Sequence, residues 1–266
     1  MSRMTIGVLG CGSMSSAIVR GLHKESKAYE YFTFTPSYTR AEKLAGAVGG
    51  TAVRDVRDLK NKDFYLIACQ PQQFDELATM LHGVLTEESV AISVLGGLSI
   101  GHLLQKLSPC RYVARAMPNT PCMVGEGVTA LSFSKELRDR DKMVVSDIFS
   151  AVSRVFVFDD EDQIDIITGV SGCGPAYIFE FARLMIDKLR EMGIDERYVE
   201  SMVKQTFYGS SKLMTDTPAS PEKLRNEVTT EGGITARAMI AFEEMNLKRA
   251  IETAVDLAYA RAKELA

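Results

Sequence analysis

A glycine-rich hexapeptide near the start of the chain, GCGSMS at 10–15, has the residue types that let a backbone approach phosphate. It follows a short apolar run, MTIGVL at 4–9, and precedes residues whose apolar positions repeat at helical spacing. This order predicts a strand, a tight turn and a helix. Gly10 permits the turn, and Gly12 admits a pyrophosphate at the helix N-terminus, with Ser15 as the third small residue. A dinucleotide site is therefore expected; the alternative is a glycine turn that binds nothing.

The end of the second expected strand indicates which dinucleotide would bind. An NAD enzyme usually places an acid here for the ribose hydroxyls, yet TFTPSYTR at 33–40 contains none. Thr35, Ser37 and Arg40 instead offer hydroxyls and a guanidinium, which give charge-assisted hydrogen bonds to a 2′-phosphate. NADPH is therefore expected in preference to NADH. The alternative is that Ser37 and Arg40 only cap and solvate the second helix.

A second glycine motif, EGGIT at 231–235, precedes an expected helix late in the chain. The amides of Gly233, Ile234 and Thr235 would converge near that helix N-terminus and form a pocket for a small carboxylate. The alternative is an ordinary glycine turn.

Composition excludes several other functions. A net charge of −4, with 31 basic and 35 acidic residues, gives no positive field for nucleic acid. Five scattered cysteines without a CxxC pair predict neither disulfides nor zinc, and fit a reducing cytoplasm. No apolar run reaches the roughly 18 residues of a membrane span. Three separated histidines disfavour a His-based metal site, so no metal is expected.

Alternating strand and helix signals over the first part of the chain predict a parallel sheet covered by helices. The expected strands are 4–9, 31–35, 63–69, 90–95, 111–117 and 155–158.

After about residue 160 the strand signal ends, and the rest of the chain is expected to form helices. We expect them to be separated by GCGP at 172–175, TDTPASP at 215–221 and EGG at 231–233. The periodic stretch Ile240–Leu265 carries an apolar stripe wide enough to pack on this chain and on a partner.

The segment RAMPNTPCMVGEG at 115–127 fits neither the helical nor the strand periodicity, because two prolines and an Asn-Thr pair cannot continue a strand or helix. It resembles a signature of the pyrroline-5-carboxylate reductases. Further blocks match that family in the same order: IACQP (67–71), VLGGLSI (94–100), TGVSGCGPAY (168–177), KQTFYGSSKL (204–213) and VTTEGGIT (228–235). The resemblance extends from Gly7 to about Leu265.

This resemblance implies an α/β fold, with a Rossmann-type NADP-binding domain over residues 1–160 and an all-α domain over residues 161–266. The second domain would interleave with that of another subunit, giving homodimers and possible rings of dimers. Nicotinamide would lie against MPNTP, and the ribose and phosphates against 68–71 and 96–97. The expected cofactor residues are Gly10, Gly12, Ser13, Met14, Thr35, Ser37, Arg40, Ala68, Cys69, Gln70, Pro71, Gly96, Gly97, Met117, Asn119 and Pro121.

The implied reaction is NADPH-dependent reduction of 1-pyrroline-5-carboxylate to L-proline, the last step of proline biosynthesis. A ring imine accepts hydride as its iminium, so the site needs a proton source. Thr235, near the ring nitrogen in similar proteins, or a water that it holds, is the candidate catalytic group. Glu161 matches a family acid that is expected to reach the substrate. The expected substrate residues are Glu161, Gly232, Gly233, Ile234 and Thr235.

Three of the residues that depart from the family pattern bear on the site. Gln70 replaces a lysine near the cofactor, Pro218 replaces an acid that often faces that lysine, and Glu231 replaces a proline before the carboxylate-binding turn. Two alternatives stay open. One is a related NADP-dependent imine or hydroxyacid oxidoreductase, and the other is a catalytically idle nucleotide-binding paralogue with a regulatory role.

Overall fold

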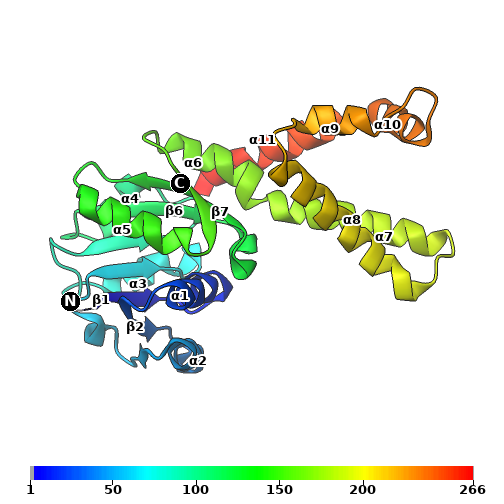
Figure 1. Ribbon diagram of the computed structural model, residues 1–266. Coiled ribbons are helices and arrows are strands. Elements are labelled where there is room, and N and C mark those ends of the chain that lie inside the picture. The colour runs from blue at the N-terminus through cyan, green and yellow to red at the C-terminus, as the bar shows by residue number, and fades with distance from the viewer. Residues whose placement is uncertain (1–2, 266) are drawn as a thin grey trace. The chain divides into compact units, whose positions relative to one another are not determined.

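The computed structural model describes residues 3–265. Within them, eight strands from the first part of the chain form one sheet (Figure 1). Its order is β3-β2-β1-β4-β5-β6-β7-β8, and neighbours are parallel except β6 and β7. The bounds are β1 Met4–Leu9, β2 Tyr29–Phe34, β3 Thr51–Ala52, β4 Phe64–Ile67, β5 Val90–Ser93, β6 Tyr112–Pro118, β7 Gly127–Phe133 and β8 Ser153–Val157.

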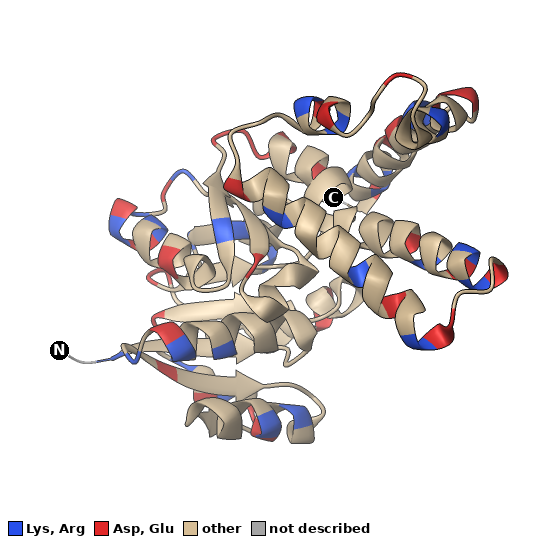
Figure 2. Cartoon of the chain, turned by 45° about the vertical axis from the view of Figure 1, so that its right-hand side comes forward, with Lys and Arg blue, Asp and Glu red and all other residues tan. Residues whose placement is uncertain are grey.

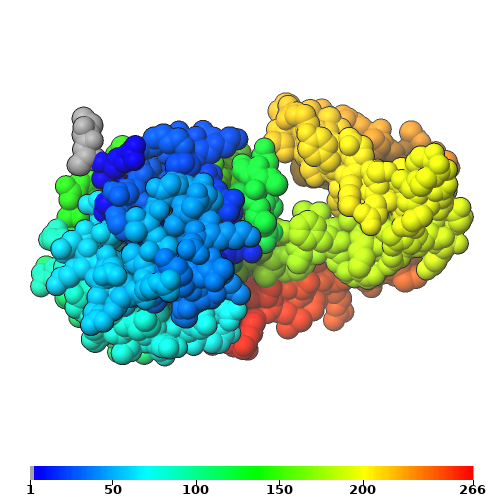
Figure 3. Space-filling view, turned by 90° about the horizontal axis from the view of Figure 1, so that it is seen from below, coloured from blue at the N-terminus to red at the C-terminus, as the bar shows by residue number. Residues whose placement is uncertain are grey.

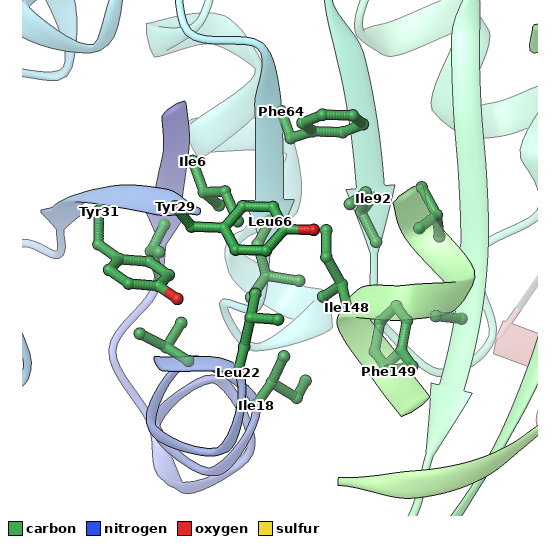
Figure 4. Packing of buried hydrophobic residues seen from close by; sticks show 14 of the residues in the cluster. Ile6, Ile18, Leu22, Tyr29, Tyr31, Phe64, Leu66, Ile92, Ile148 and Phe149 are labelled. Carbon is green, nitrogen blue, oxygen red and sulfur yellow. The ribbon is translucent and has the colours of Figure 1, made fainter. Parts of the chain in front are cut away.

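Helices cover both faces of this sheet and bury the two sides of each central strand. In β4, Phe64 and Leu66 join the core on the face covered by α1, α2 and α5, whereas Tyr65 and Ile67 join the core under η1, α3 and α4. Figure 4 shows Phe64 and Leu66 in one cluster with side chains of α1 and α5, namely Ile18, Leu22, Ile148 and Phe149. Each large apolar side chain buried in this way contributes about 1.5–3 kcal/mol. The bounds are α1 Ser13–Glu25, α2 Tyr38–Val48, η1 Val56–Leu59, η2 Pro71–Gln73, α3 Phe74–Met80, α4 Ile100–Lys106, η3 Thr120–Val124 and α5 Asp139–Ser150.

The six predicted strands are all present, with ends shifted by a few residues, and the predicted parallel sheet is confirmed except at one pair of strands. Gly127–Phe133 forms β7, which the sequence analysis missed, and it runs antiparallel to β6. The chain reverses between them through η3 and Gly125, which has a φ of 81° that suits glycine. A two-residue strand, β3, was also missed.

The chain divides into two compact units. The first comprises the residues up to Cys173 together with the segment from Leu257 onward, and the second is Gly174–Asp256. Helices follow one another from residue 162 to the end: α6 Asp162–Ile167, η4 Thr168–Gly172, α7 Gly174–Glu191, α8 Glu196–Asp216, α9 Pro221–Glu227, α10 Ile234–Glu244 and α11 Leu247–Leu265. The functional boundary near residue 160 stays a prediction.

Two predictions about these helices need correction. GCGP at 172–175 was expected to separate helices, but the chain stays helical and only widens into the π-helical turn η4, with Cys173 itself in a right-handed helical conformation. The stretch Ile240–Leu265 is not one helix, because Asn246 adopts a φ of 55° and divides α10 from α11. Gaps at 217–220 and 228–233 do fall at the other two expected breaks.

The second unit leaves many apolar side chains exposed. Phe179 on α7 and Tyr208 on α8 are each 64% exposed, while only Pro175, Val199 and Val203 are buried in these two helices. Charged residues are interspersed along the same helices, whereas the strands of the first unit are nearly free of them (Figure 2). No helix within residues 3–265 is long and apolar enough to cross a membrane.

Candidate active site

Three loops meet where β1, β2 and β4 end. The amide of Gly10 donates to the carbonyl of Phe34 (2.9 Å), and the amide of Ala68 donates to the carbonyl of Leu9 (2.8 Å). Gly10 has a φ of 99°, and a Cβ added to it would lie 2.6 Å from the carbonyl carbon of Ala68. Only glycine fits this position, so the turn predicted from GCGSMS forms at the carboxyl edge of the sheet.

A cavity of about 460 Å³ occupies this edge. A Cβ added to Gly12 would meet nothing within 4 Å, so the backbone at the start of α1 is open to a ligand. These features fit a dinucleotide whose pyrophosphate lies at the α1 N-terminus. The lining residues that the sequence predicted are Gly10, Gly12, Thr35, Ser37, Arg40, Ala68, Cys69 and Gln70; Ser13, Met14 and Pro71 are not among its lining residues.

The loop after β2 offers its polar groups to the cavity. Ser37 is the N-cap residue of α2, yet its side chain makes no capping hydrogen bond, which removes the alternative that it serves as a cap. Arg40 is exposed and forms no ion pair with any described residue. A free hydroxyl and a free guanidinium are therefore available to an anion.

Two further cations line a second cavity with Arg40, and neither was predicted from the sequence. Arg20 of α1 and Lys43 of α2 line this cavity of about 620 Å³ together with Arg40, Ser13 and Ser16, and no carboxylate lines it. None of the three cations forms an ion pair within residues 3–265. Lys43 follows Arg40 by one turn of α2, so the two side chains lie on the same face of that helix. This relation is evident only once the helix is known.

The MPNTP segment at the end of β6 is held rigidly. Asn119 is buried; its amide nitrogen donates to the carbonyl and hydroxyl oxygens of Ser171 (3.1 and 3.3 Å), and its amide oxygen accepts from the amide of Val128 (2.8 Å). The polar atoms of Asn119 thus fix the segment, and leave the half-buried Met117 and Pro121 as the groups that could face a nicotinamide.

The Gly96-Gly97 loop follows β5 at the same edge. Gly97 has a φ of 82°, and a Cβ added to it would lie 2.5 Å from the Cβ of Leu265 at the end of α11. The loop therefore needs glycine both for its backbone angle and for the close approach of α11.

Glu161 lies in the first unit and already has protein partners. Its Oε1 accepts from the amide of Ile100 (2.7 Å) and from Nη1 of Arg115 (2.9 Å). Its Oε2 accepts no hydrogen bond from a described residue, so one carboxylate oxygen of Glu161 is free to bind a substrate. Arg115, buried within β6, was not predicted from the sequence.

The EGGIT turn lies in the second unit and differs from expectation in one detail. The amide of Gly233 donates to the carbonyl of Thr230 (2.9 Å), so it is not available to a carboxylate. The amides of Ile234 and Thr235, the first residues of α10, have no acceptor within the described chain. Gly232 has a φ of 71° and shapes the turn. Glu231 is exposed and makes no ion pair with a described residue.

The cysteines near the cavity are not nucleophiles. Burial raises the pKa of the Cys69 thiol to about 11 and that of the Cys11 thiol to about 12. Both thiols stay protonated at neutral pH. All five cysteines are free.

Comparison with known proteins identifies the family. Residues 161–265 match the family described as pyrroline-5-carboxylate reductase dimerisation, and residues 5–97 match that described as NADP oxidoreductase, coenzyme F420-dependent. Pyrroline-5-carboxylate reductase of Haemophilus influenzae is 30% identical over 267 residues, which cover 100% of this chain and 98% of that protein.

Solved structures agree over the full length. A pyrroline-5-carboxylate reductase from Coxiella burnetii is 29% identical, with a TM-score of 0.87 and 98% of each chain covered. The pyrroline carboxylate reductase of Plasmodium falciparum with NADP bound is 26% identical, with a TM-score of 0.86 and coverage of 100% of this chain and 99% of that one. The chain therefore belongs to the pyrroline-5-carboxylate reductase family.

Proposed function

We propose that this chain reduces 1-pyrroline-5-carboxylate to L-proline with NADPH, the last step of proline biosynthesis. The observation that carries the proposal is the cavity at the carboxyl ends of β1, β2 and β4, which is open at Gly12 and bordered by the unpaired Arg40. The full-length relationship to the reductases identifies the substrate.

The cofactor residues divide into four groups by what they do. Gly12, Ser13 and Met14 offer the start of α1 to the pyrophosphate, while Thr35, Ser37 and Arg40 bind the 2′-phosphate. Loops 68–71 and 96–97 border the ribose and phosphates. Met117 and Pro121 line the nicotinamide, and Asn119 orients them. When bound, the cofactor supplies the hydride.

The substrate carboxylate binds the amides of Ile234 and Thr235 at the N-terminus of α10, where the helix dipole also favours an anion. Gly232 and Gly233 keep the approach free of side chains. The Thr235 hydroxyl is too weak an acid to protonate an imine by itself, so it holds a water molecule through which a solvent proton reaches the ring nitrogen. Glu161, in the first unit, keeps its Oε2 free as a hydrogen-bond acceptor for a substrate N–H.

The functional assembly is a homodimer formed by residues 161–265, a segment that matches the dimerisation family. The exposed Phe179 and Tyr208 supply apolar surface for that contact. Dimers assemble further into rings, and the free cysteines fit a cytoplasmic location.

A turnover assay tests the function. Purified protein with NADPH and pyrroline-5-carboxylate should lose NADPH absorbance at a rate proportional to enzyme. Absence of oxidation between about pH 6 and pH 9, together with absence of NADP reduction by proline, would reject the proposal. That result would favour the idle paralogue, which Gln70 and Glu231 motivate.

A further inference from the structure

Arg115 is a buried cation that the proposed chemistry does not use. Its side chain is 2% exposed on β6, two residues before Met117. Its two terminal nitrogens donate to Glu161 and Asp165, and its Nε is buried without a hydrogen-bond partner among residues 3–265. An arginine is costly to bury, so two carboxylates are needed to hold it there.

Glu161 connects this cation to the loop after β5. The same Oε1 that accepts from Arg115 also accepts from the amide of Ile100, the first residue of α4. Ile100 follows Gly97 by three residues, so the carboxylate fixes the far end of the Gly96-Gly97 loop. The loop position thus depends on a side chain that is itself oriented by Arg115.

Asp165 connects the same cation to the end of α11. Asp165 is 2% exposed, and Nζ of Lys263 lies 3.8 Å from its Oδ2 while donating to Asp162 at 2.6 Å. Arg115 alone cannot neutralise Glu161 and Asp165, and Lys263 supplies the second positive charge. A hydrogen bond from Lys263 to Asp162 raises the pKa of Lys263, so this charge is kept at neutral pH.

Leu265 completes the path back to the loop. Its Cβ lies where a side chain at position 97 would be, so the end of α11 packs directly on Gly97. In Figure 3 the red end of the chain lies beside the cyan surface of the first unit. The loop is therefore held from two sides, by Glu161 at Ile100 and by α11 at Gly97.

We propose that Arg115 and Lys263 are positioning residues for NADPH, which hold the Gly96-Gly97 loop in its cofactor-binding conformation through Glu161 and the end of α11. The proposal rests on the proposed function in one respect, the assignment of this loop to the cofactor phosphates and ribose. It gives the last turn of α11, far from that loop in sequence, a role in cofactor affinity.

The test compares Lys263→Met, which keeps the apolar stem, with Lys263→Arg, which restores the charge. Arg261→Met is the matched control, because Arg261 lies on the same turn and, among the described residues, forms an ion pair only with the exposed Glu264. NADPH binding to each full-length variant is measured by fluorescence titration well below its unfolding temperature. We expect Kd to rise roughly threefold to fivefold in Lys263→Met, because an exposed ion pair contributes only a small stabilisation. Lys263→Arg and Arg261→Met should stay within about twofold of the wild type.

Steady-state kinetics separates positioning from a merely structural role. In Lys263→Met, KM for NADPH should rise with Kd while kcat at saturating NADPH changes by less than about twofold. An unchanged Kd accompanied by a lower melting temperature overturns the proposal, as does an equal loss of affinity in Arg261→Met. Wild-type protein that binds NADPH but does not turn over pyrroline-5-carboxylate would refute the proposed function and leave this test intact.

Discussion

Removal of the Arg40 guanidinium should change cofactor selectivity without changing the chemical step. Arg40 is exposed, lines the cofactor cavity and has no carboxylate partner among the described residues, so its charge is available to the 2′-phosphate. A charge-assisted hydrogen bond contributes about 1.5–3 kcal/mol, and solvent exposure reduces this to the lower end. A loss of about 1.4 kcal/mol is a tenfold change in affinity. Arg40→Ala should therefore raise KM for NADPH about tenfold.

NADH lacks the 2′-phosphate and provides the internal comparison. Its KM should stay within about twofold in Arg40→Ala, so the ratio of kcat/KM for NADPH to that for NADH should fall about tenfold. Lys24→Ala is the matched control, because Lys24 is an exposed cation in the last turn of α1, at the opposite end from Gly12. An unchanged KM for NADPH, or an equal rise for NADH, would refute the reasoning. Loss of affinity in Lys24→Ala would show that net charge alone is responsible.

The remaining predictions concern chemistry, stability and assembly. Thr235→Ala should lower kcat by roughly ten- to a hundredfold while Thr235→Ser keeps most activity, as measured by NADPH oxidation; full activity of the alanine variant contradicts the proton assignment. Tyr31→Phe removes a buried hydroxyl that has no hydrogen-bond partner in the described part of the chain, so thermal unfolding should show unchanged or higher stability, by up to about 1 kcal/mol, and a clear loss would reveal a missed partner. Asn119→Ala leaves the Val128 amide unpaired and should lower the free energy of unfolding by about 1–3 kcal/mol in urea titrations; no loss would show that the segment is held otherwise. Phe179→Glu places a charge in the proposed dimer contact and should give monomers in light scattering, whereas an intact dimer would exclude this face.

Local patterns predicted the elements that carry the site. The apolar run before Gly10 and the helical spacing after it are enough to define β1 and α1, because each signal lies within a few residues. The strand β7 was not predicted, because its short apolar run directly follows the prolines and glycines of 115–127, which are typical of turns. The break at Asn246 was missed because helical periodicity continues across a single residue of positive φ.

Long-range contacts could not be predicted from one sequence. Arg115 is 46 residues from Glu161 and 50 from Asp165, and Lys263 is 101 residues from Asp162. Nothing in the local pattern links them; only the sheet order and the return of α11 bring them together. Similarly, the hydrogen bond from the Gly233 amide to Thr230 depends on the backbone angles of Gly232. A Gly-Gly sequence does not determine those angles, because glycine can adopt many conformations.

Deuterium transfer tests the central claim most directly. The protein is incubated with pyrroline-5-carboxylate and NADPH that carries deuterium at both C4 positions of the nicotinamide, and the amino acid product is analysed by mass spectrometry. We expect L-proline with a single deuterium at C5, the ring carbon bonded to nitrogen that does not bear the carboxylate. Absence of proline, or proline without deuterium, would contradict direct hydride transfer from NADPH to the imine.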